Sequence, residues 1–584
     1  LTQALADLEN GTGGIVTLVG EAGIGKSRLV AEFRRGAVTA PLHWAEGRCL
    51  SYGGSVAYLL WLDLLRALLG VTIDDTQAEV QVVLRKRVQA WCPGHLDEVY
   101  PFLAALMALP LGKEVEASLE ELDGQQRKAG TFRAVKILVA SAARYRPLAL
   151  VAEDVHWGDP SSLELLEELL ALTADLPLLI VCISRPQREH RSWHLRQLAA
   201  RDHGPRHTDL CLGPLSHAES AVLVGNLLWL DHLPSELKER ILERAEGNPF
   251  YLEEVLRALI DDRAIERDEA TGRWLAVREA ADIAIPETLQ GVLTARIDRL
   301  QEQTKQVLRM ASVIGRVFLY RVLAAVAEEE QDLDARLFTL QQEEMIRERA
   351  RLPELEFTFK HHLTQEAAYN GLLKRDRRRL HRQVASALER LFPERLEELL
   401  GLLAYHWERA GVPDKATEYL LRAGDQARLV YAHEESIDFY QRALVFLKKR
   451  GDDEPTARAL MRLGLTYDAA LDLQQARRAY EEGFVFWRRA EQAAEATVRR
   501  PAPHALREPA GEPLTLDPAL AADESSLALV EQLFSGLVDL TSDSSIVPGV
   551  AASWEVSQDG CKVVFHLRDD VHWSDTAPVT AHDF

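Results

Sequence analysis

The sequence predicts a multidomain protein that begins with an α/β domain and continues with mostly helical domains. The chain has 584 residues, and a single hydrophobic core seldom grows beyond about 250–300 residues. Continuous apolar runs at Ile15–Val19 and Leu148–Ala152 are typical of strands that are buried on both faces of a parallel sheet. Ala, Leu, Glu and Arg are abundant throughout and β-branched runs are short, which favours helices in the rest of the chain.

Charge and cysteine usage exclude some classes of protein. The net charge is -22, which argues against a chain that coats nucleic acid or an anionic membrane. No stretch of 18 residues is free of charged side chains, so we expect no transmembrane helix. The five cysteines are scattered and never form a C-x-x-C pair. We therefore expect reduced thiols and a cytoplasmic protein.

The stretch Gly20–Ser27 reads GEAGIGKS and matches the phosphate-binding pattern G-x-x-x-x-G-K-[ST] without a mismatch. It lies between the strand expected at Ile15–Val19 and a helix expected at Ser27–Arg35, where such a loop must lie. Its glycines allow consecutive backbone N–H groups to turn toward one phosphate. Lys26 is expected on the β- and γ-phosphates and Ser27 on Mg²⁺. The predicted nucleotide-binding residues are Gly20, Glu21, Ala22, Gly23, Ile24, Gly25, Lys26 and Ser27.

Two adjacent carboxylates follow the second apolar run, in the sequence LALVAEDVHWGDP. Glu153 and Asp154 fall at the carboxyl end of a strand, where open α/β sheets place their catalytic residues. One carboxylate is needed to hold Mg²⁺ through its water shell, and the other can orient or deprotonate a water. Asp159 and Ser161 are also expected to cap a helix at Ser162–Leu172. Both interpretations can hold together.

Arg185 follows another apolar run, Leu176–Ile183. An arginine at this strand end would stabilise charge that develops on a γ-phosphate. The alternative is an ordinary surface arginine. The next tract, from His190 to Cys211, contains four histidines and one cysteine among several arginines. We interpret it as a solvated loop and keep a zinc site as the less favoured alternative.

Four stretches together resemble the AAA-type ATPase module of STAND signalling proteins, as found in large LuxR-type regulators and in proteins linked to adenylate or guanylate cyclases. They read GEAGIGKSRL, EDVHWGDPSSLELL, ISRP and AEGNPFYLEEVLRAL. The resemblance implies that Glu153 is the acid on the Mg²⁺ side and that Asp154 activates water. It further implies that Arg185 is a sensor and that Pro249 contacts the adenine.

The region 285–362 resembles the winged-helix domain of the same family. Two amphipathic helices are expected at 285–300 and 304–315, and a β-hairpin at 345–362. A winged helix together with the basic run Lys374–Arg379 invites a DNA-binding interpretation. The following sequence also matches the STAND family, where this domain is a packing and relay element. We therefore favour a solvated helix face for these charges.

From residue 401 the chain repeats itself, with Tyr440 and Tyr480 forty residues apart and each placed three residues before an Ala or Gly. This pattern fits helix pairs of tetratricopeptide type, in which small residues let neighbouring helices approach. Four prolines between residues 501 and 513 mark a linker.

The sequence beyond the linker resembles the start of a family 5 solute-binding protein, the peptide and nickel receptors of ABC importers. A strand is expected at Val563–Leu567 and an apolar helical face at Leu527–Leu540. Because the segment is short, we expect it neither to fold by itself nor to bind peptide.

The predicted fold class is therefore an α/β P-loop NTPase core, then an α-helical lid, a winged helix and a helical solenoid, then a partial α/β solute-binding segment. The boundaries are the core at 1–215, the lid at 216–284, the winged helix at 285–364, the tetratricopeptide-like repeats at 365–497, the linker at 498–511 and the family 5 fragment at 512–584.

The sequence favours a regulatory ATPase switch with slow ATP hydrolysis that uses ATP and Mg²⁺. We expect a protein partner on the helical repeats and nucleotide-driven self-association, and neither nucleic acid nor a peptide ligand. The first alternative is a component of an ABC import system, although the L-S-G-G-Q signature is absent. The second is a DNA-binding initiator-type ATPase.

Overall fold

The structure is a computed structural model, and the chain divides into two compact units, Leu1–Ala416 and Thr417–Phe584. Each unit is described by itself. The described residues are 1–37, 42–49, 56–72, 75–120, 122, 124–228, 235–267, 274–277, 283, 286, 288–327, 332–350, 355–495, 530, 533–541, 545–557, 562–574 and 576–584.

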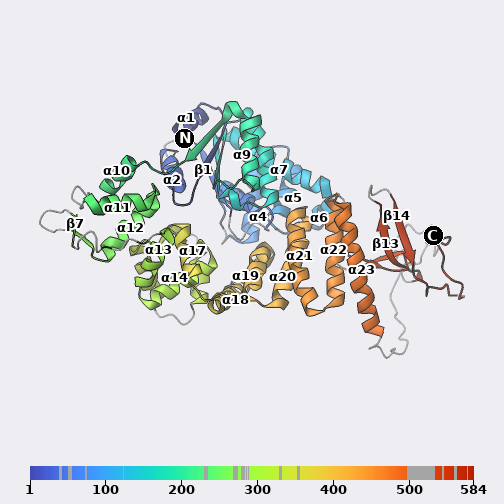
Figure 1. Cartoon of the computed structure of the whole chain (residues 1–584). Coiled ribbons are helices and arrows are strands. Elements are labelled where there is room, and N and C mark those ends of the chain that lie inside the picture. The colour runs from blue at the N-terminus through green and yellow to red at the C-terminus, as the bar shows by residue number, and fades with distance from the viewer. Residues whose placement is uncertain are drawn as a thin grey trace. The chain divides into compact units, whose positions relative to one another are not determined.

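The first unit begins with a five-stranded parallel sheet whose strand order is β2-β3-β4-β1-β5, with helices packed around it (Figure 1). The strands are β1 (Gly14–Gly20), β2 (His43–Arg48), β3 (Leu148–Glu153), β4 (Leu178–Ser184) and β5 (His207–Leu212). Every residue of β3 and β4 is buried, as the continuous apolar runs predict.

Strand β5 and the helix before it correct our interpretation of the histidine-rich tract as a solvated loop. Helix α9 (Arg191–Asp202) and β5 occupy most of that tract. The strand pairs with β1 along one side only and lies at the edge of the sheet. Its sequence HTDLCL therefore lacks the continuous apolar run that marks a central strand, which is why the sequence pattern did not indicate it.

Helices surround this sheet, and several match the expected segments closely. Helix α8 begins after Asp159, whose Oδ1 accepts a hydrogen bond from Ser162 N at 2.8 Å, so the predicted cap is confirmed for Asp159. Helix α8 spans Pro160–Leu170, and the helices before it are α1 (Thr2–Glu9), α2 (Lys26–Ala37), α3 (Leu59–Leu69), α4 (Gln77–Trp91), α5 (Leu96–Leu106), α6 (Lys113–Glu120) and α7 (Gly124–Tyr145).

A helical subdomain follows the sheet. It comprises α10 (His217–Leu228), α11 (Ser235–Ala245), α12 (Pro249–Asp261) and the two-stranded pair β6 (Ile265–Arg267) and β7 (Trp274–Ala276). The helices bury a common apolar cluster that includes Ile241, Leu252 and Val255.

The next part, residues 289–370, is called here the three-stranded module. Its sheet has the order β8-β10-β9 and is antiparallel, so the β-hairpin expected at 345–362 is confirmed. Its elements are α13 (Leu289–Arg299), α14 (Glu302–Ile314), β8 (Val317–Leu319), α15 (Tyr320–Val326), α16 (Leu333–Gln342), β9 (Ile346–Ala350), β10 (Glu356–Phe359) and α17 (His362–Asn370). Helices α18 (Lys374–Leu391) and α19 (Leu400–Ala410) come next.

Helix α20 (Pro413–Leu429) contains the boundary between the units, and the second unit continues with α21 (His433–Arg450), α22 (Asp453–Ala469) and α23 (Leu473–Glu495). Helices α21 to α23 lie side by side (Figure 1) and are called here the helical array. The ring of Tyr440 packs on Gly424, and the ring of Tyr480 packs on Gly464. Small residues therefore do let neighbouring helices approach, at two places forty residues apart.

The rest of the second unit is a pair of small sheets, β11 (Val538–Leu540) with β12 (Ile546–Pro548), and β13 (Ala551–Val556) with β14 (Val563–Leu567). The predicted strand at Val563–Leu567 is confirmed. The helical face predicted for Leu527–Leu540 is wrong at its end, because Val538–Leu540 pairs as a strand with β12. The predicted linker at 498–511 lies outside the described residues.

Candidate functional site

The phosphate-loop sequence forms the turn between β1 and α2. Gly23 and Gly25 have φ angles of 80° and 103°, which side chains with a Cβ rarely adopt. No atom lies within 4 Å of the position that a Cβ would take on Gly25, so the loop is open at this residue. The first N–H groups of α2 have no partner inside the helix. This geometry fits an anion at the loop.

Lys26 is the first residue of α2, and its ammonium group is folded back onto the loop. Its Nζ donates to Gly20 O at 2.7 Å and to Glu21 O at 2.8 Å. Burial lowers the pKa of Lys26 to about 8, although the charge of Asp154 opposes this shift. Ser27 follows it on the exposed side of the first turn.

Glu153, the last residue of β3, is engaged by an arginine from the neighbouring strand. Arg48 Nε donates to Glu153 Oε2 at 2.7 Å, and a second guanidinium nitrogen contacts the same oxygen. Burial would raise the pKa of Glu153, but the charges of Arg48 and Arg316 outweigh burial and hold this pKa below its usual value. In this arrangement Oε2 of Glu153 accepts both hydrogen bonds from Arg48.

Asp154 is engaged by the three-stranded module. Arg316 lies just before β8, and its Nη1 is 2.8 Å from Asp154 Oδ2. Burial raises the pKa of Asp154, and the charge of Arg316 opposes that shift. Asp154 also has a positive φ of 56°, which is unusual for a residue with a Cβ and is associated with functional sites.

Arg185 lies directly after β4 and also contacts the three-stranded module. Its guanidinium donates to His362 Nε2, at the start of α17. The same guanidinium lies 5.3 Å from the centre of the Trp157 ring. Burial, followed by the charge of Arg185, lowers the pKa of His362 to about 2, so the neutral imidazole can accept this hydrogen bond.

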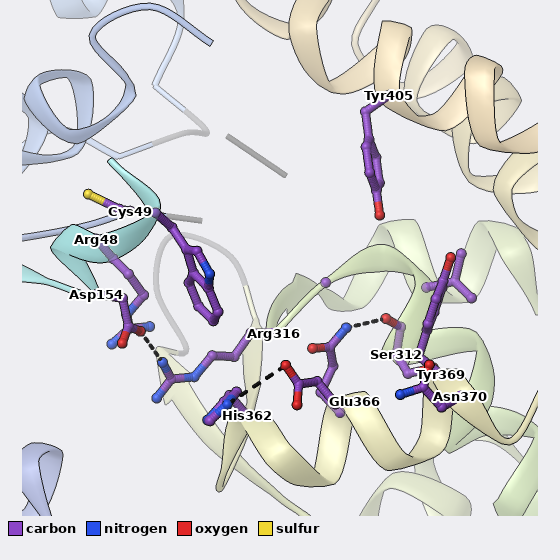
Figure 2. Close-up of a pocket in the computed structure, with 14 residues that line it drawn as sticks. Arg48, Cys49, Asp154, Ser312, Arg316, His362, Glu366, Tyr369, Asn370 and Tyr405 are labelled. Carbon is purple, nitrogen blue, oxygen red and sulfur yellow. Dashed lines mark hydrogen bonds and ion pairs between the residues drawn. The ribbon is translucent and has the colours of Figure 1, made fainter. Parts of the chain in front are cut away.

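Arg48, Asp154, Arg316 and His362 line a cavity of about 360 Å³ between the sheet and the three-stranded module (Figure 2), whereas Lys26, Glu153 and Arg185 are not among its lining residues. Figure 2 shows the side chain of Arg316 extending from the module to Asp154, with Arg48 close by. Glu366 and Tyr369 of α17 line the cavity further from the sheet, together with Tyr405 of α19. Arg316 Nε is buried there and has no hydrogen-bond partner among the described residues, which is consistent with room for an acceptor.

Pro249 is the first residue of α12, and the residue before it contacts the phosphate loop. Asn248 Nδ2 donates to Ala22 O at 3.1 Å, while its Oδ1 accepts from Phe250 N and Tyr251 N. A Cβ on Gly23 would lie 2.9 Å from Asn248 Oδ1. The N-cap of α12 therefore fixes Pro249 beside the loop.

The sequence predictions did not include three residues of this site: Arg48, Arg316 and His362. Arg48 could have been found, because β2 and β3 are parallel neighbours and Arg48 is the register partner of Glu153. No local pattern marks Arg316 or His362, which are 162 and 177 residues from their partners in the chain.

Most of the basic run Lys374–Arg379 is exposed on the first turns of α18. Arg377 differs, because its guanidinium donates to Leu372 O at 3.0 Å and to Asn370 O at 2.8 Å. Over the described part of the chain, no group of three His, Cys, Asp or Glu side chains is placed to hold a metal ion. No helix among the described residues is long and apolar enough to span a membrane.

Family models match three parts of the chain. Residues 1–181 match the AAA ATPase domain, residues 216–273 match a domain of unknown function, DUF8739, and residues 545–584 match the middle part of the bacterial extracellular solute-binding proteins, family 5. The chain thus carries an AAA ATPase domain and a partial family 5 segment, which confirms the AAA-type and the family 5 parts of the two resemblances. The transport and DNA-initiator alternatives are not favoured.

Two kinds of curated relative match different parts of the chain. The uncharacterized protein R02095 of Rhizobium meliloti (strain 1021) is 28% identical over 495 residues, which is 82% of this chain and 45% of that protein. The periplasmic murein peptide-binding protein MppA of Escherichia coli (strain K12) is 45% identical over 73 residues, which is 12% of this chain and 13% of that protein. The chain therefore spans less than half the length of either relative.

The solved structures that match this chain include a STAND protein with a tetratricopeptide repeat sensor, PH0952 from Pyrococcus horikoshii. It is 12% identical with a TM-score of 0.33, over 85% of this chain and 84% of that one. The ORC2 protein of Aeropyrum pernix is also 12% identical, with a TM-score of 0.26 over 63% of this chain and 91% of that one.

Proposed function

We propose that this chain is a regulatory ATPase switch of the STAND kind, which binds ATP and Mg²⁺ at Gly20–Ser27 and hydrolyses ATP slowly. The observation that carries the proposal is the position of Asp154. This acid follows β3, which is separated from β1 and its phosphate loop by β4, and it is paired with Arg316 from another module. A catalytic acid held in this way fits a site that is controlled by a movement between modules.

Each residue of the site has a proposed role. Lys26 binds the β- and γ-phosphates, and the Pro249 ring contacts the adenine. The hydroxyl of Ser27 and the carboxylate of Glu153 are oxygen donors of the type that Mg²⁺ prefers. Asp154 orients the attacking water and accepts its proton, and Arg185 stabilises the charge on the phosphoryl oxygens. When bound, ATP supplies the phosphoryl group and Mg²⁺ neutralises its oxygens.

The proposed role of the three-stranded module is to restrain ATP hydrolysis by pairing with the catalytic side chains. Arg316 is paired with Asp154, and His362 accepts a hydrogen bond from Arg185. An acid with a guanidinium against it is a poorer proton acceptor, because the paired charge favours its ionised form. Separation of the module from the sheet would free both catalytic side chains together. The control of hydrolysis and the signal output would then depend on the same movement.

The helical array is the proposed surface for a protein partner, and nucleotide-driven self-association is the proposed response to ATP. Cys49, Cys92 and Cys182 are buried and form no disulfide within the described part of the chain, which supports a reducing environment such as the cytoplasm.

Calorimetric titration of ATP with Mg²⁺ tests the proposed site. Lys26→Ala should weaken ATP binding about 10–150-fold, because a charged hydrogen bond contributes about 1.5–3 kcal/mol. Lys86→Ala is the matched control, because Lys86 is exposed on α4 and should leave the affinity unchanged. Equal ATP affinity for wild type and Lys26→Ala would show that the phosphate loop is not the nucleotide site.

A further inference from the structure

Two aromatic positions of the helical array, Tyr440 and Tyr480, are forty residues apart, and different kinds of element cover them. Tyr440 and Leu444 of α21 are buried in a cluster that includes Leu460 and Leu463 of α22, so the following helix covers them. Tyr480 and Phe484 lie forty residues further along, on α23, and are only 3% and 2% exposed. Their cluster is completed by Trp554 of β13. A β-strand therefore occupies the place that another helix would take.

The contacts of Trp554 are those of a buried aromatic cluster. Its ring centroid lies 4.5 Å from that of Phe484, with the two rings nearly perpendicular, and 5.7 Å from that of Tyr480. Trp554 is 8% exposed. Edge-to-face pairs of this kind stabilise a contact beyond the area that they bury. Trp554 is therefore an anchor on α23.

Further contacts extend along the same surface. Val538, Ile546 and Val556, from β11, β12 and β13, pack against the cluster. Arg462 of α22 donates to Ser545 Oγ at 3.3 Å, and Ser545 is 1% exposed. The docked surface thus includes both apolar and polar contacts, and it reaches α22 as well as α23. Figure 1 shows β13 and β14 beside α23.

We propose that β11, β12 and β13 form the C-terminal cap of the helical array, with Trp554 as its anchor. The last helix of a stacked array exposes the apolar face that a next repeat would cover, and such arrays need a terminal cap. Here that cap is a segment whose sequence matches a solute-binding family from residue 545 onward. While the cap is docked, the α23 end of the array is closed to any partner. This proposal does not depend on nucleotide binding.

Hydrogen exchange of the α23 amides in the full chain tests the cap. Trp554→Ala should raise the exchange rates of amides between residues 476 and 490 about tenfold, because the helix loses its anchor. Trp573→Ala is the matched control, since Trp573 also lies in the stretch 545–584 that matches the solute-binding family but is outside the cap and 41% exposed. Unchanged α23 exchange in Trp554→Ala would overturn the proposal, as would an equal increase in both variants.

A double-mutant cycle separates direct contact from a general loss of structure. Phe484→Ala and Trp554→Ala should each raise α23 exchange, and the double variant should exchange much more slowly than the product of the two increases predicts. Increases that multiply would show that the two rings are independent, and the cap assignment would fail. Amides of β1 and β3 serve as an internal reference and should keep wild-type exchange in every variant.

Discussion

Arg316 Nη1 lies 2.8 Å from Asp154 Oδ2, although the two residues are 162 positions apart and belong to different modules. Asp154 is the acid that we propose to activate water, and both side chains are largely buried. Removal of one partner from a buried ion pair leaves an uncompensated charge. Whether the Asp154 carboxylate is ion-paired therefore depends on the position of the three-stranded module.

The two adjacent acids should give different kinetic defects. Asp154→Asn keeps the shape of the side chain but cannot accept a proton, so the turnover rate should fall by about 10²–10⁴-fold with ATP affinity preserved. Glu153→Gln should instead raise the Mg²⁺ concentration that gives the half-maximal rate. Titration of the ATPase rate with Mg²⁺ distinguishes them, and exchanged phenotypes would reverse the two roles.

Asp159 should contribute strongly to stability. Its Oδ1 accepts from Ser162 N at 2.8 Å and from Tyr58 N at 2.9 Å. Asp159→Ala would leave two buried N–H groups without a partner, and should lower the free energy of unfolding by about 1–3 kcal/mol or more. Asp175→Ala is the control, because Asp175 is exposed. Equal thermal unfolding of both variants would contradict the role of Asp159 as a buried cap.

The packing of Tyr480 on Gly464 should be intolerant of a methyl group. A Cβ at position 464 would lie 2.3 Å from Tyr480 Cε1, so Gly464→Ala must push α22 and α23 apart and should destabilise the array by about 1–3 kcal/mol. Gly225→Ala is the control in α10, where no described atom beyond the chain neighbours and the nearby backbone of the same helix lies within 4 Å of the added carbon. Denaturant unfolding of both variants measures the difference, and a neutral Gly464→Ala would show that the helices are not closely packed here.

Two buried histidines should make the α18–α19 region sensitive to acid. His381 Nδ1 lies 2.9 Å from His406 Nδ1. Burial lowers the pKa of His381 to about 3 and places that of His406 well below its usual value. The unfolded chain binds these protons near pH 6.5 and the folded chain does not. Stability is therefore full above pH 6.5 and falls below it by about 1.4 kcal/mol per pH unit for each histidine.

Hydrogen exchange of α18 and α19 between pH 6.5 and 5, corrected for intrinsic rates, measures this loss. His381→Gln should reduce its slope, whereas His95→Gln, at an exposed position, should not. Burial raises the pKa of Asp159 to about 6, so protonation of Asp159 stabilises the folded chain as the pH falls, whereas protonation of the histidines destabilises it. Asp159 is a single group in another part of the fold. A slope that is unchanged in His381→Gln would contradict the assignment.

Much of the core could be predicted from local sequence. The loop from Gly20 to Ser27 and the acids after β3 were marked by patterns that need only neighbouring residues. Strand β5 was missed because its exposed edge removes the apolar run. The partners Arg316 and His362 could not be predicted, because their positions depend on how separate modules pack. Trp554 was likewise assigned to a solute-binding segment, and nothing in its sequence indicated α23 as its contact.

Steady-state ATP hydrolysis by Arg316→Met tests the central claim most directly. Methionine keeps much of the side-chain volume but cannot pair with Asp154, so the rate should rise several-fold above wild type. Addition of Asp154→Asn to the same chain should lower the rate to that of Asp154→Asn alone, because the released acid is the one that acts. A rate in Arg316→Met that falls as far as it does in Asp154→Asn would contradict the account, because Arg316 would then assist hydrolysis rather than restrain it.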